Sequence, residues 1–149
     1  MSARPRALAV CLAVAALDQA AKAAVSGSLH LGETSDLGLG FQLTHTENRG
    51  VAFGFLGGGG APVVVVTIAA LGLVLAWFWR NPERPGLWLA TGLIAGGALG
   101  NMIDRVRIGA VTDFLDPPLW PAFNVADVAI TAGAAILVLV TLAPERAPP

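Results

Sequence analysis

The chain has 149 residues, of which 55% are hydrophobic and 13% are charged, and its net charge is −1. A soluble domain carries about twice that share of charged residues, so the composition, with a mean hydropathy of +0.70, predicts an integral membrane protein with a single domain over residues 1–149. The near-neutral charge gives no reason to expect a nucleic-acid partner, and the single cysteine, Cys11, excludes a disulfide framework within the chain.

Four apolar segments are long enough to cross a hydrocarbon core of about 30 Å as helices, which takes about 20 residues. They cover residues 7–25, 61–79, 87–103 and 125–142. The predicted fold class is an all-α polytopic membrane protein with four transmembrane helices and two extracytoplasmic segments, residues 26–60 and 104–124. Four crossings place both termini on one side, and arginines beside the first span indicate that this side is the cytoplasm.

The first predicted span contains two charged residues, Asp18 and Lys22, near its outer end. They stand four residues apart and therefore share one helix face. An ion pair that lets the helix tolerate both charges is one interpretation. The other is that both line a polar pocket near the outer surface, because a carboxylate about 18 Å along the helix is costly unless it is hydrated or paired.

The outer segment that follows shows the period-two alternation that is typical of β-strands. Apolar residues alternate with small or polar ones over residues 37–44 and again over residues 51–55, and residues 46–50 between them have the composition of a turn. We therefore expect a small β-hairpin or sheet with one apolar face, suited to resting on the bilayer or binding an extended peptide. The four glycines at 57–60 predict a flexible joint.

The second and third spans have the patterns of packing elements. The second is almost wholly apolar and ends in Trp77 and Trp79, which suit a cytoplasmic membrane interface. The third contains Gly92, Gly96 and Gly100 at four-residue spacing. Small residues at this period allow helices to approach closely in lipid, so we expect this face to pack against another helix.

Polar groups are concentrated in residues 96–127, which contain four aspartates and two asparagines. Because helix direction alternates, the end of the third span, the start of the fourth and the end of the first all lie at the outer surface. Seven polar residues are therefore expected to converge there: Asp18, Lys22, Asn101, Asp104, Arg105, Asn124 and Asp127.

Asp113 and Asp127 flank the connection to the last span and are near enough in sequence for their carboxyl groups to meet. Two carboxyls in hydrogen-bonding reach share one proton, because repulsion and burial raise one pKa. Such a pair can draw a proton from water and polarise a peptide carbonyl. The alternative for Asn124 and Asp127 is a capping box at a helix start. No serine–histidine motif is apparent, and the histidines, His30 and His45, lack companion metal ligands.

Five segments in this order resemble the motif set of bacterial lipoprotein signal peptidase, also called signal peptidase II or prolipoprotein signal peptidase. The resemblance extends from Asp18 to Ile130 and implies an aspartic endopeptidase of the cell inner membrane. Such an enzyme removes the signal peptide by cutting before the diacylglyceryl-modified cysteine, near the periplasmic surface. It needs no metal or organic cofactor, and its partners are prolipoproteins and membrane lipid, with the enzyme itself a monomer. The segments are Asp18–Lys22, Asn48–Gly54, Gly96–Arg105, Gly109–Phe114 and Phe123–Asp127.

The resemblance also implies roles for individual residues. The catalytic pair falls on Asp113 and Asp127. Four residues match positions that support the pair or hold the substrate: Asn48, Asn101, Arg105 and Asn124. Asp18, Lys22 and Asp104 match positions that shape the pocket, and the resemblance leaves the role of Asp116 open.

Two other functions compete with the peptidase. Intramembrane carboxylates also serve as proton relays, which would suit a small proton-coupled transporter or channel subunit. The polar groups would then have to continue through to the cytoplasm, whereas the sequence places them at one side. A non-enzymatic membrane scaffold, whose carboxylates only cap helices, is the second alternative.

Overall fold

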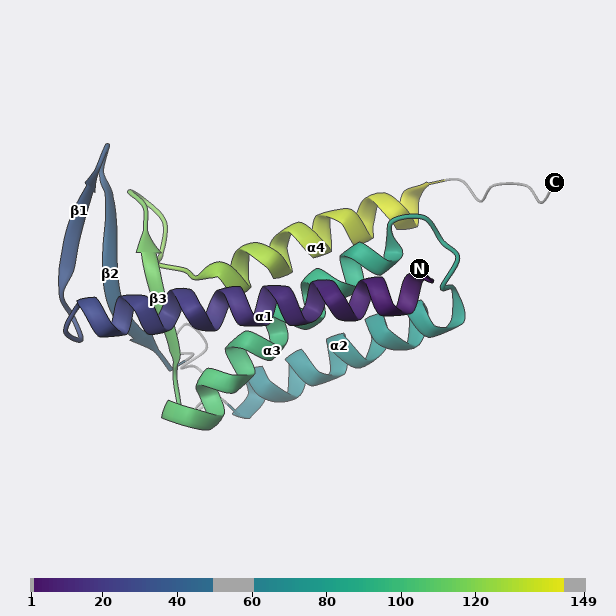
Figure 1. Ribbon diagram of the computed structural model, residues 1–149, viewed down its shortest axis with the longest axis horizontal. Coiled ribbons are helices and arrows are strands. Elements are labelled where there is room, and N and C mark those ends of the chain that lie inside the picture. The colour runs from purple at the N-terminus through teal and green to yellow at the C-terminus, as the bar shows by residue number, and fades with distance from the viewer. Residues whose placement is uncertain (1, 50–60, 144–149) are drawn as a thin grey trace.

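The computed structural model describes residues 2–49 and 61–143, and in these ranges the chain forms four helices and three strands (Figure 1). The helices run along the long axis of the molecule, and the sheet lies at one end of them (Figure 1). The helices are α1 (Ala3–Ser28), α2 (Ala61–Arg80), α3 (Leu87–Ile108) and α4 (Val125–Leu142); the strands are β1 (Thr34–Gly38), β2 (Phe41–Asn48) and β3 (Val111–Asp116).

All four predicted spans are helical, and a small sheet is present, as expected. By length and composition, α1 and α4 are apolar enough to cross a bilayer, and residues 64–80 of α2 form a shorter apolar helix. Glycines and a polar C-terminal end give α3 a more mixed composition. Four membrane crossings therefore stay a prediction, whereas the helical architecture is confirmed.

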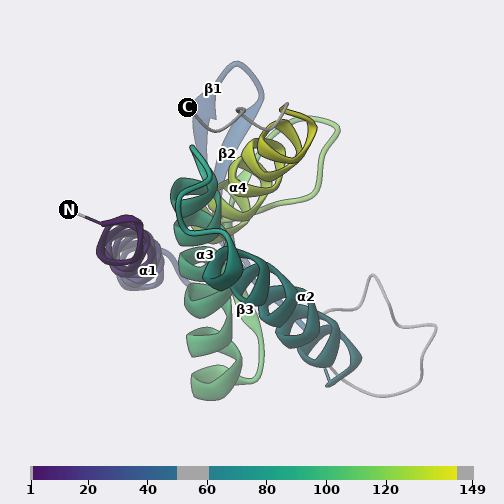
Figure 2. The same ribbon diagram turned by 90° about the vertical axis from the view of Figure 1, so that its right-hand side faces the viewer.

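Helix α3 lies at the centre of the bundle, between α1 and α4, with α2 against a further side (Figure 2). Its glycines make this possible. A Cβ atom at Gly92 would lie 2.8 Å from the Ala7 carbonyl oxygen of α1, and one at Gly96 would lie 2.7 Å from the Cys11 carbonyl oxygen. The expected packing role of the glycines is confirmed.

Gly97 faces the other neighbour of α3, because a Cβ there would collide with the Ala126 carbonyl oxygen in the first turn of α4. We expect Gly97→Ala to cost about 1–3 kcal/mol of stability, as overpacking does, and to lower activity by displacing the turn that carries Asp127. Thermal unfolding in detergent measures the first effect. Gly72→Ala in α2 is the matched control, since a Cβ there meets nothing within 4 Å. Equal unfolding temperatures for both variants would contradict the expected collision.

The sheet has the order β1-β2-β3 and both pairs are antiparallel. The chain turns at Leu39 and Gly40, which both have positive φ, as in a type I′ hairpin. The predicted turn at 46–50 is therefore misplaced, because residues 46–48 belong to β2. Apolar residues alternate with small or polar ones in the same way along one continuous strand and along the two strands of a hairpin. The period-two pattern therefore did not reveal the turn. The predicted strand 51–55 and the glycine joint 57–60 lie outside the described residues.

Strand β3 was not expected within the second outer segment. It ends in a loop that returns to α4 and is closed by Phe123, whose carbonyl oxygen accepts from the Phe114 and Leu115 amides at 3.0 and 2.8 Å. The Phe123 amide in turn donates to the Leu115 carbonyl oxygen at 2.9 Å. This closure brings the start of α4 beside β3.

Candidate active site

Buried polar side chains gather where the ends of α1 and α3, the start of α4 and strand β3 meet. Asp18 and Asn124 are fully buried, and Asp113 is 3% exposed. At the opposite end of the bundle the core consists of Ala7, Phe78, Leu87 and Val140. The convergence predicted from helix direction is confirmed for the residues that form this cluster: Asp18, Lys22, Asn101, Asp104, Asn124 and Asp127.

One side chain, Asn124, connects the carboxylate of Asp113 to the backbone of Asp127. Its Nδ2 donates to Asp113 Oδ1 at 2.7 Å, and its Oδ1 accepts from the Asp127 backbone amide at 2.9 Å. The second contact fixes the orientation of the amide group, because a backbone N–H can only donate. Asn124 therefore holds Asp113 beside the first turn of α4, where Asp127 stands.

Asn101 supports the other carboxylate in the same manner. Its Nδ2 donates to Asp127 Oδ1 at 2.9 Å, while its Oδ1 accepts from Lys22 Nζ at 2.9 Å and from Asn124 Nδ2 at 3.2 Å. An ammonium group has no acceptor, so Lys22 obliges Asn101 to turn its oxygen inward. The amide N–H is thereby directed at Asp127.

Lys22 is also the cation of a buried ion-pair cluster. Its Nζ lies 2.8 Å from Asp18 Oδ2 and 3.0 Å from Asp104 Oδ2. The predicted Asp18–Lys22 ion pair is confirmed, and so is the location of both residues at the polar cluster. Buried charges need further hydrogen bonds to offset their desolvation, and here backbone amides supply them.

Those amides belong to the elements that carry the two catalytic candidates. The Ala126 amide of α4 donates to Asp18 Oδ1 at 2.9 Å, and the Thr112 amide of β3 donates to Asp104 Oδ2 at 3.0 Å. Asp127 follows Ala126 directly and Asp113 follows Thr112 directly. The two acidic partners of Lys22 therefore fix the backbone beside each carboxylate.

The two carboxylates have different surroundings. The pKa of Asp113 is raised to about 6, mainly by burial and further by the nearby Asp127 carboxylate. The hydrogen bonds from Asn48 and Asn124 and the positive charge of Lys22 lower this pKa and so oppose the rise. The Asn48 contact joins its Nδ2 to Asp113 Oδ2 at 3.0 Å. Asp127 is partly exposed. A buried carboxyl with a raised pKa beside a more accessible carboxyl is an arrangement that suits acid–base chemistry.

The capping-box alternative for α4 is also present. Asn124 accepts from the Asp127 amide, and Asp127 Oδ2 accepts from the Asn124 amide at 3.4 Å. The second bond is long, and the other oxygen of Asp127 is directed to Asn101. The cap and the contacts to Asp113 and Asn101 therefore coexist, so capping does not exclude a functional role.

Other predicted residues lie further from the pair. Arg105 donates to the Asn101 carbonyl oxygen at 3.3 Å and makes no hydrogen bond or ion pair with either carboxylate among the described residues. A substrate-binding role for Arg105 stays a prediction. Asp116 lies opposite Gln42 in the sheet, and the backbone amide of His30 donates to Glu33 at 2.7 Å.

His45 makes a contact that no pattern in the sequence predicts. Its Nε2 lies 3.3 Å from Ser26 Oγ, and its Nδ1 lies 2.9 Å from the Leu29 carbonyl oxygen. No carboxylate completes a triad here in the described part of the chain. The contacts fasten the end of α1 to β2, which is a structural role.

Gln19 belongs to the site but was not singled out from the sequence. Its Nε2 donates to Asp104 Oδ1 at 3.0 Å and to the Gly100 carbonyl oxygen at 3.1 Å, so it joins α1 to α3 beside Lys22. The only feature of the sequence that pointed to Gln19 was its position inside the Asp18–Lys22 segment. This was a weak indication, because Gln19 directly follows Asp18 and adjacent residues of a helix do not face each other.

A family profile and two curated relatives indicate the same family, and a solved structure has a similar fold. The family profile for signal peptidase (SPase) II matches residues 10–143. The lipoprotein signal peptidase of Halothermothrix orenii is 41% identical over 134 residues, which cover 87% of this chain and 90% of that protein. For the lipoprotein signal peptidase of Pelotomaculum thermopropionicum the identity is 44% over 133 residues, covering 87% and 88%. A solved structure of a bacterial membrane enzyme matches with a TM-score of 0.82 at 28% identity, covering 91% of this chain and 92% of the other.

Proposed function

Because this chain belongs to the signal peptidase II family, we propose that it removes the signal peptides of prolipoproteins as an intramembrane aspartic endopeptidase. The cut lies N-terminal to the diacylglyceryl-modified cysteine of the precursor, and Asp113 and Asp127 are the catalytic pair. One observation carries the proposal: the side chain of Asn124 donates to Asp113 and accepts from the backbone of Asp127. This link joins the Asp113 carboxylate to the first turn of α4, which carries Asp127, and so supports the assignment of the two residues as a pair.

The two carboxyl groups have separate tasks. Asp127, the more accessible group, takes a proton from water as the water oxygen attacks the scissile carbonyl carbon. Asp113, whose burial raises its pKa to about 6, donates its proton to the carbonyl oxygen. Collapse of the resulting diol breaks the C–N bond: Asp127 gives its proton to the leaving nitrogen, and a diol hydroxyl returns a proton to Asp113. Asn101 and Asn124 keep both groups oriented throughout.

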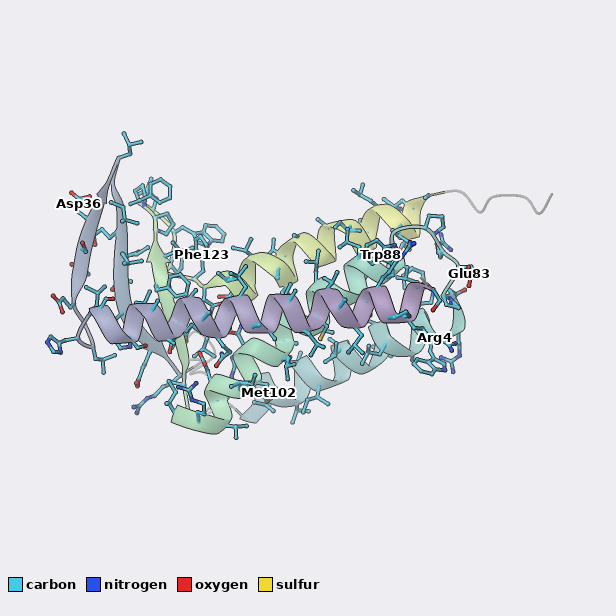
Figure 3. The ribbon with its side chains drawn as sticks, viewed as in Figure 1. Arg4, Asp36, Glu83, Trp88, Met102 and Phe123 are labelled. Carbon is cyan, nitrogen blue, oxygen red and sulfur yellow. The ribbon has the colours of Figure 1, made fainter. Side chains whose placement is uncertain are left out.

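We infer that all four helices cross the bacterial cytoplasmic membrane, with both termini in the cytoplasm and the site near the periplasmic surface. The start of α1 and the end of α4 lie at the same end of the molecule (Figure 1). Arg4 lies 4.3 Å from the ring centre of Trp79 there, and Trp88 belongs to the same end, opposite Asp36 of the sheet (Figure 3). Arginine and tryptophan together are typical of a membrane interface.

The location of the site suits a substrate that is held in lipid. A diacylglyceryl precursor reaches the enzyme laterally, with its cysteine near the outer leaflet, and meets the carboxylates at similar depth. The membrane thereby supplies part of the proximity that the reaction needs. The described residues of one chain provide both carboxylates and their supports, so a monomer is sufficient.

A transporter is less well supported than a peptidase. A relay would need polar groups along the whole bundle, but its far end is filled by Ala7, Phe78, Leu87 and Val140. Thr91 is a buried polar residue in α3, and its hydroxyl has no hydrogen-bond partner among the described residues. An isolated hydroxyl does not continue a proton path.

The direct test of function uses purified protein in detergent with two forms of one prolipoprotein precursor. The diacylglyceryl-modified form is expected to be cut directly before the cysteine, and the unmodified form to stay intact. Mass spectrometry of both products identifies the bond. Cleavage elsewhere, or no cleavage of the modified form, would contradict the proposal, whereas proton flux in liposomes without cleavage would favour the transporter.

The raised pKa of Asp113 predicts the pH dependence of cleavage. The acid form of a carboxyl is lost as pH rises through its pKa, so kcat/KM should fall tenfold per unit above pH about 6. Asn48→Ala removes a hydrogen bond that lowers this pKa, so the alkaline limb should move to higher pH. A pH–rate series on both proteins measures the shift.

The control for this prediction is Asn81→Ala. Asn81 donates to the Trp77 carbonyl oxygen at 2.9 Å at the far end of the bundle, so its removal should leave the pH profile in place. A pH profile of Asn48→Ala that does not shift, or that shifts to lower pH, would show that Asn48 does not lower the pKa of Asp113.

A further inference from the structure

Two leucines at the far edge of the sheet have an unusual combination of backbone shape and exposure. Leu39 and Leu119 are the non-glycine residues with positive φ in the described ranges, at 56° and 65°. Leucine disfavours this conformation, whereas glycine and asparagine adopt it easily. Their exposures are 98% and 104%, so packing within the chain explains neither residue.

The two turns that carry these leucines lie against each other. Leu39 is in the β1–β2 turn, Leu119 is in the β3–α4 loop, and the neighbouring Gly40 approaches Pro118 so closely that a Cβ would lie 3.4 Å from its Cγ. Figures 1 and 2 both place the turns on the α4 side of the molecule. They form one protruding edge, here called the apolar tip: Leu37, Leu39, Phe41, Leu119 and Trp120.

The composition of the apolar tip indicates its partner. Residues 37–42 and 117–121 contain no charged side chain, and Trp120 is of the type that favours the boundary between headgroups and acyl chains. In the first turn of α4, which follows this loop in the chain, Val128 is 50% exposed. A lipid bilayer can deform around a protruding edge, whereas a protein partner would need a pocket shaped to receive it.

We propose that the apolar tip inserts into the outer leaflet of the bilayer beside α4, at the level where headgroups meet acyl chains. The sheet is then held to the membrane at its far edge as well as through α1 and α4. Because β3 carries Asp113, this second anchor fixes the depth of the catalytic pair relative to a lipid-tethered substrate. The proposal rests on the membrane placement proposed for α4 and not on the peptidase chemistry.

Spin labels test the proposal in protein reconstituted into vesicles of phosphatidylethanolamine and phosphatidylglycerol. Single cysteines are introduced by Leu39→Cys or Leu119→Cys in a Cys11→Ser background. Collision rates are measured with oxygen, which concentrates in lipid, and with a nickel chelate, which stays in water. Both labels are expected to collide more with oxygen and less with the chelate than a label from Thr34→Cys, at the opposite end of β1.

Each other outcome contradicts the insertion. Labels at 39 and 119 that meet the chelate as freely as the label at 34 would show a tip in water. Exclusion of both reagents would show a tip covered by protein. A fourth label, from Val138→Cys on the exposed face of α4, distinguishes a failure of the tip insertion from a failure of the membrane placement of α4. If this label also lacks contact with oxygen, the membrane placement of α4 is contradicted as well.

Discussion

Asp113→Asn and Asp127→Asn are each expected to lower kcat for a diacylglyceryl precursor by at least about 10³-fold, since each removes one half of the acid–base pair. An amide has the shape of the carboxylate but neither takes a proton from water nor donates one as an acid. Asn124 and Asn101 still find an oxygen acceptor in each variant, so both proteins should fold. Precursor cleavage in detergent, followed over time, measures the loss.

The matched control for these variants is Asp36→Asn. Asp36 lies on exposed strand β1, and its Oδ1 accepts from the Gly38 amide at 2.7 Å, a contact that asparagine preserves. It should keep full activity. Unfolding temperatures close to that of the parent would show that the dyad variants lose chemistry and not structure, and substantial turnover by either dyad variant would refute the assigned roles.

Lys22→Met is expected to lose both activity and stability. The cation holds two buried carboxylates, Asp18 and Asp104, at 2.8 and 3.0 Å, and breaking a buried pair costs about 3–5 kcal/mol. Asn101 also loses the donor that orients its amide, so the hydrogen bond to Asp127 weakens. Thermal unfolding and kcat, measured on one preparation, report the two effects.

A double variant separates the two roles of Lys22. Adding Asp104→Asn to Lys22→Met restores the original net charge of the cluster, so much of the lost stability should return. The orientation of Asn101 is not restored, and kcat should stay low. Recovery of both quantities together would mean that Lys22 acts on stability alone.

The helices and the gathering of charges could be predicted from the sequence, because hydropathy and helix direction decide both. Asp18 and Lys22 stand one turn apart, and alternating crossings bring Asn101 and Asn124 to the same end. These inferences depend on the spacing of residue types and on no atomic detail.

The contacts that orient the pair could not be predicted. Whether Asn101 turns its nitrogen to Asp127 depends on Lys22, which reaches it from another helix. The links from Asp18 to Ala126 and from Asp104 to Thr112 involve backbone amides, whose sequence identity is irrelevant to the contact. The predicted hairpin turn was misplaced because Leu39 stands at a position where glycine or asparagine is usual. Strand β3 was not predicted because it is only six residues long.

Carbon-13 NMR of the aspartate side-chain carboxyls, from pH about 4 to about 9, tests the shared proton directly. One signal should titrate with a midpoint near 6, be absent in Asp113→Asn, and move to lower pH in Asp127→Asn, where the neighbouring negative charge is gone. A carboxyl of Asp113 that instead titrates near its ordinary value of about 4, unchanged by Asp127→Asn, would contradict a catalytic dyad at this site.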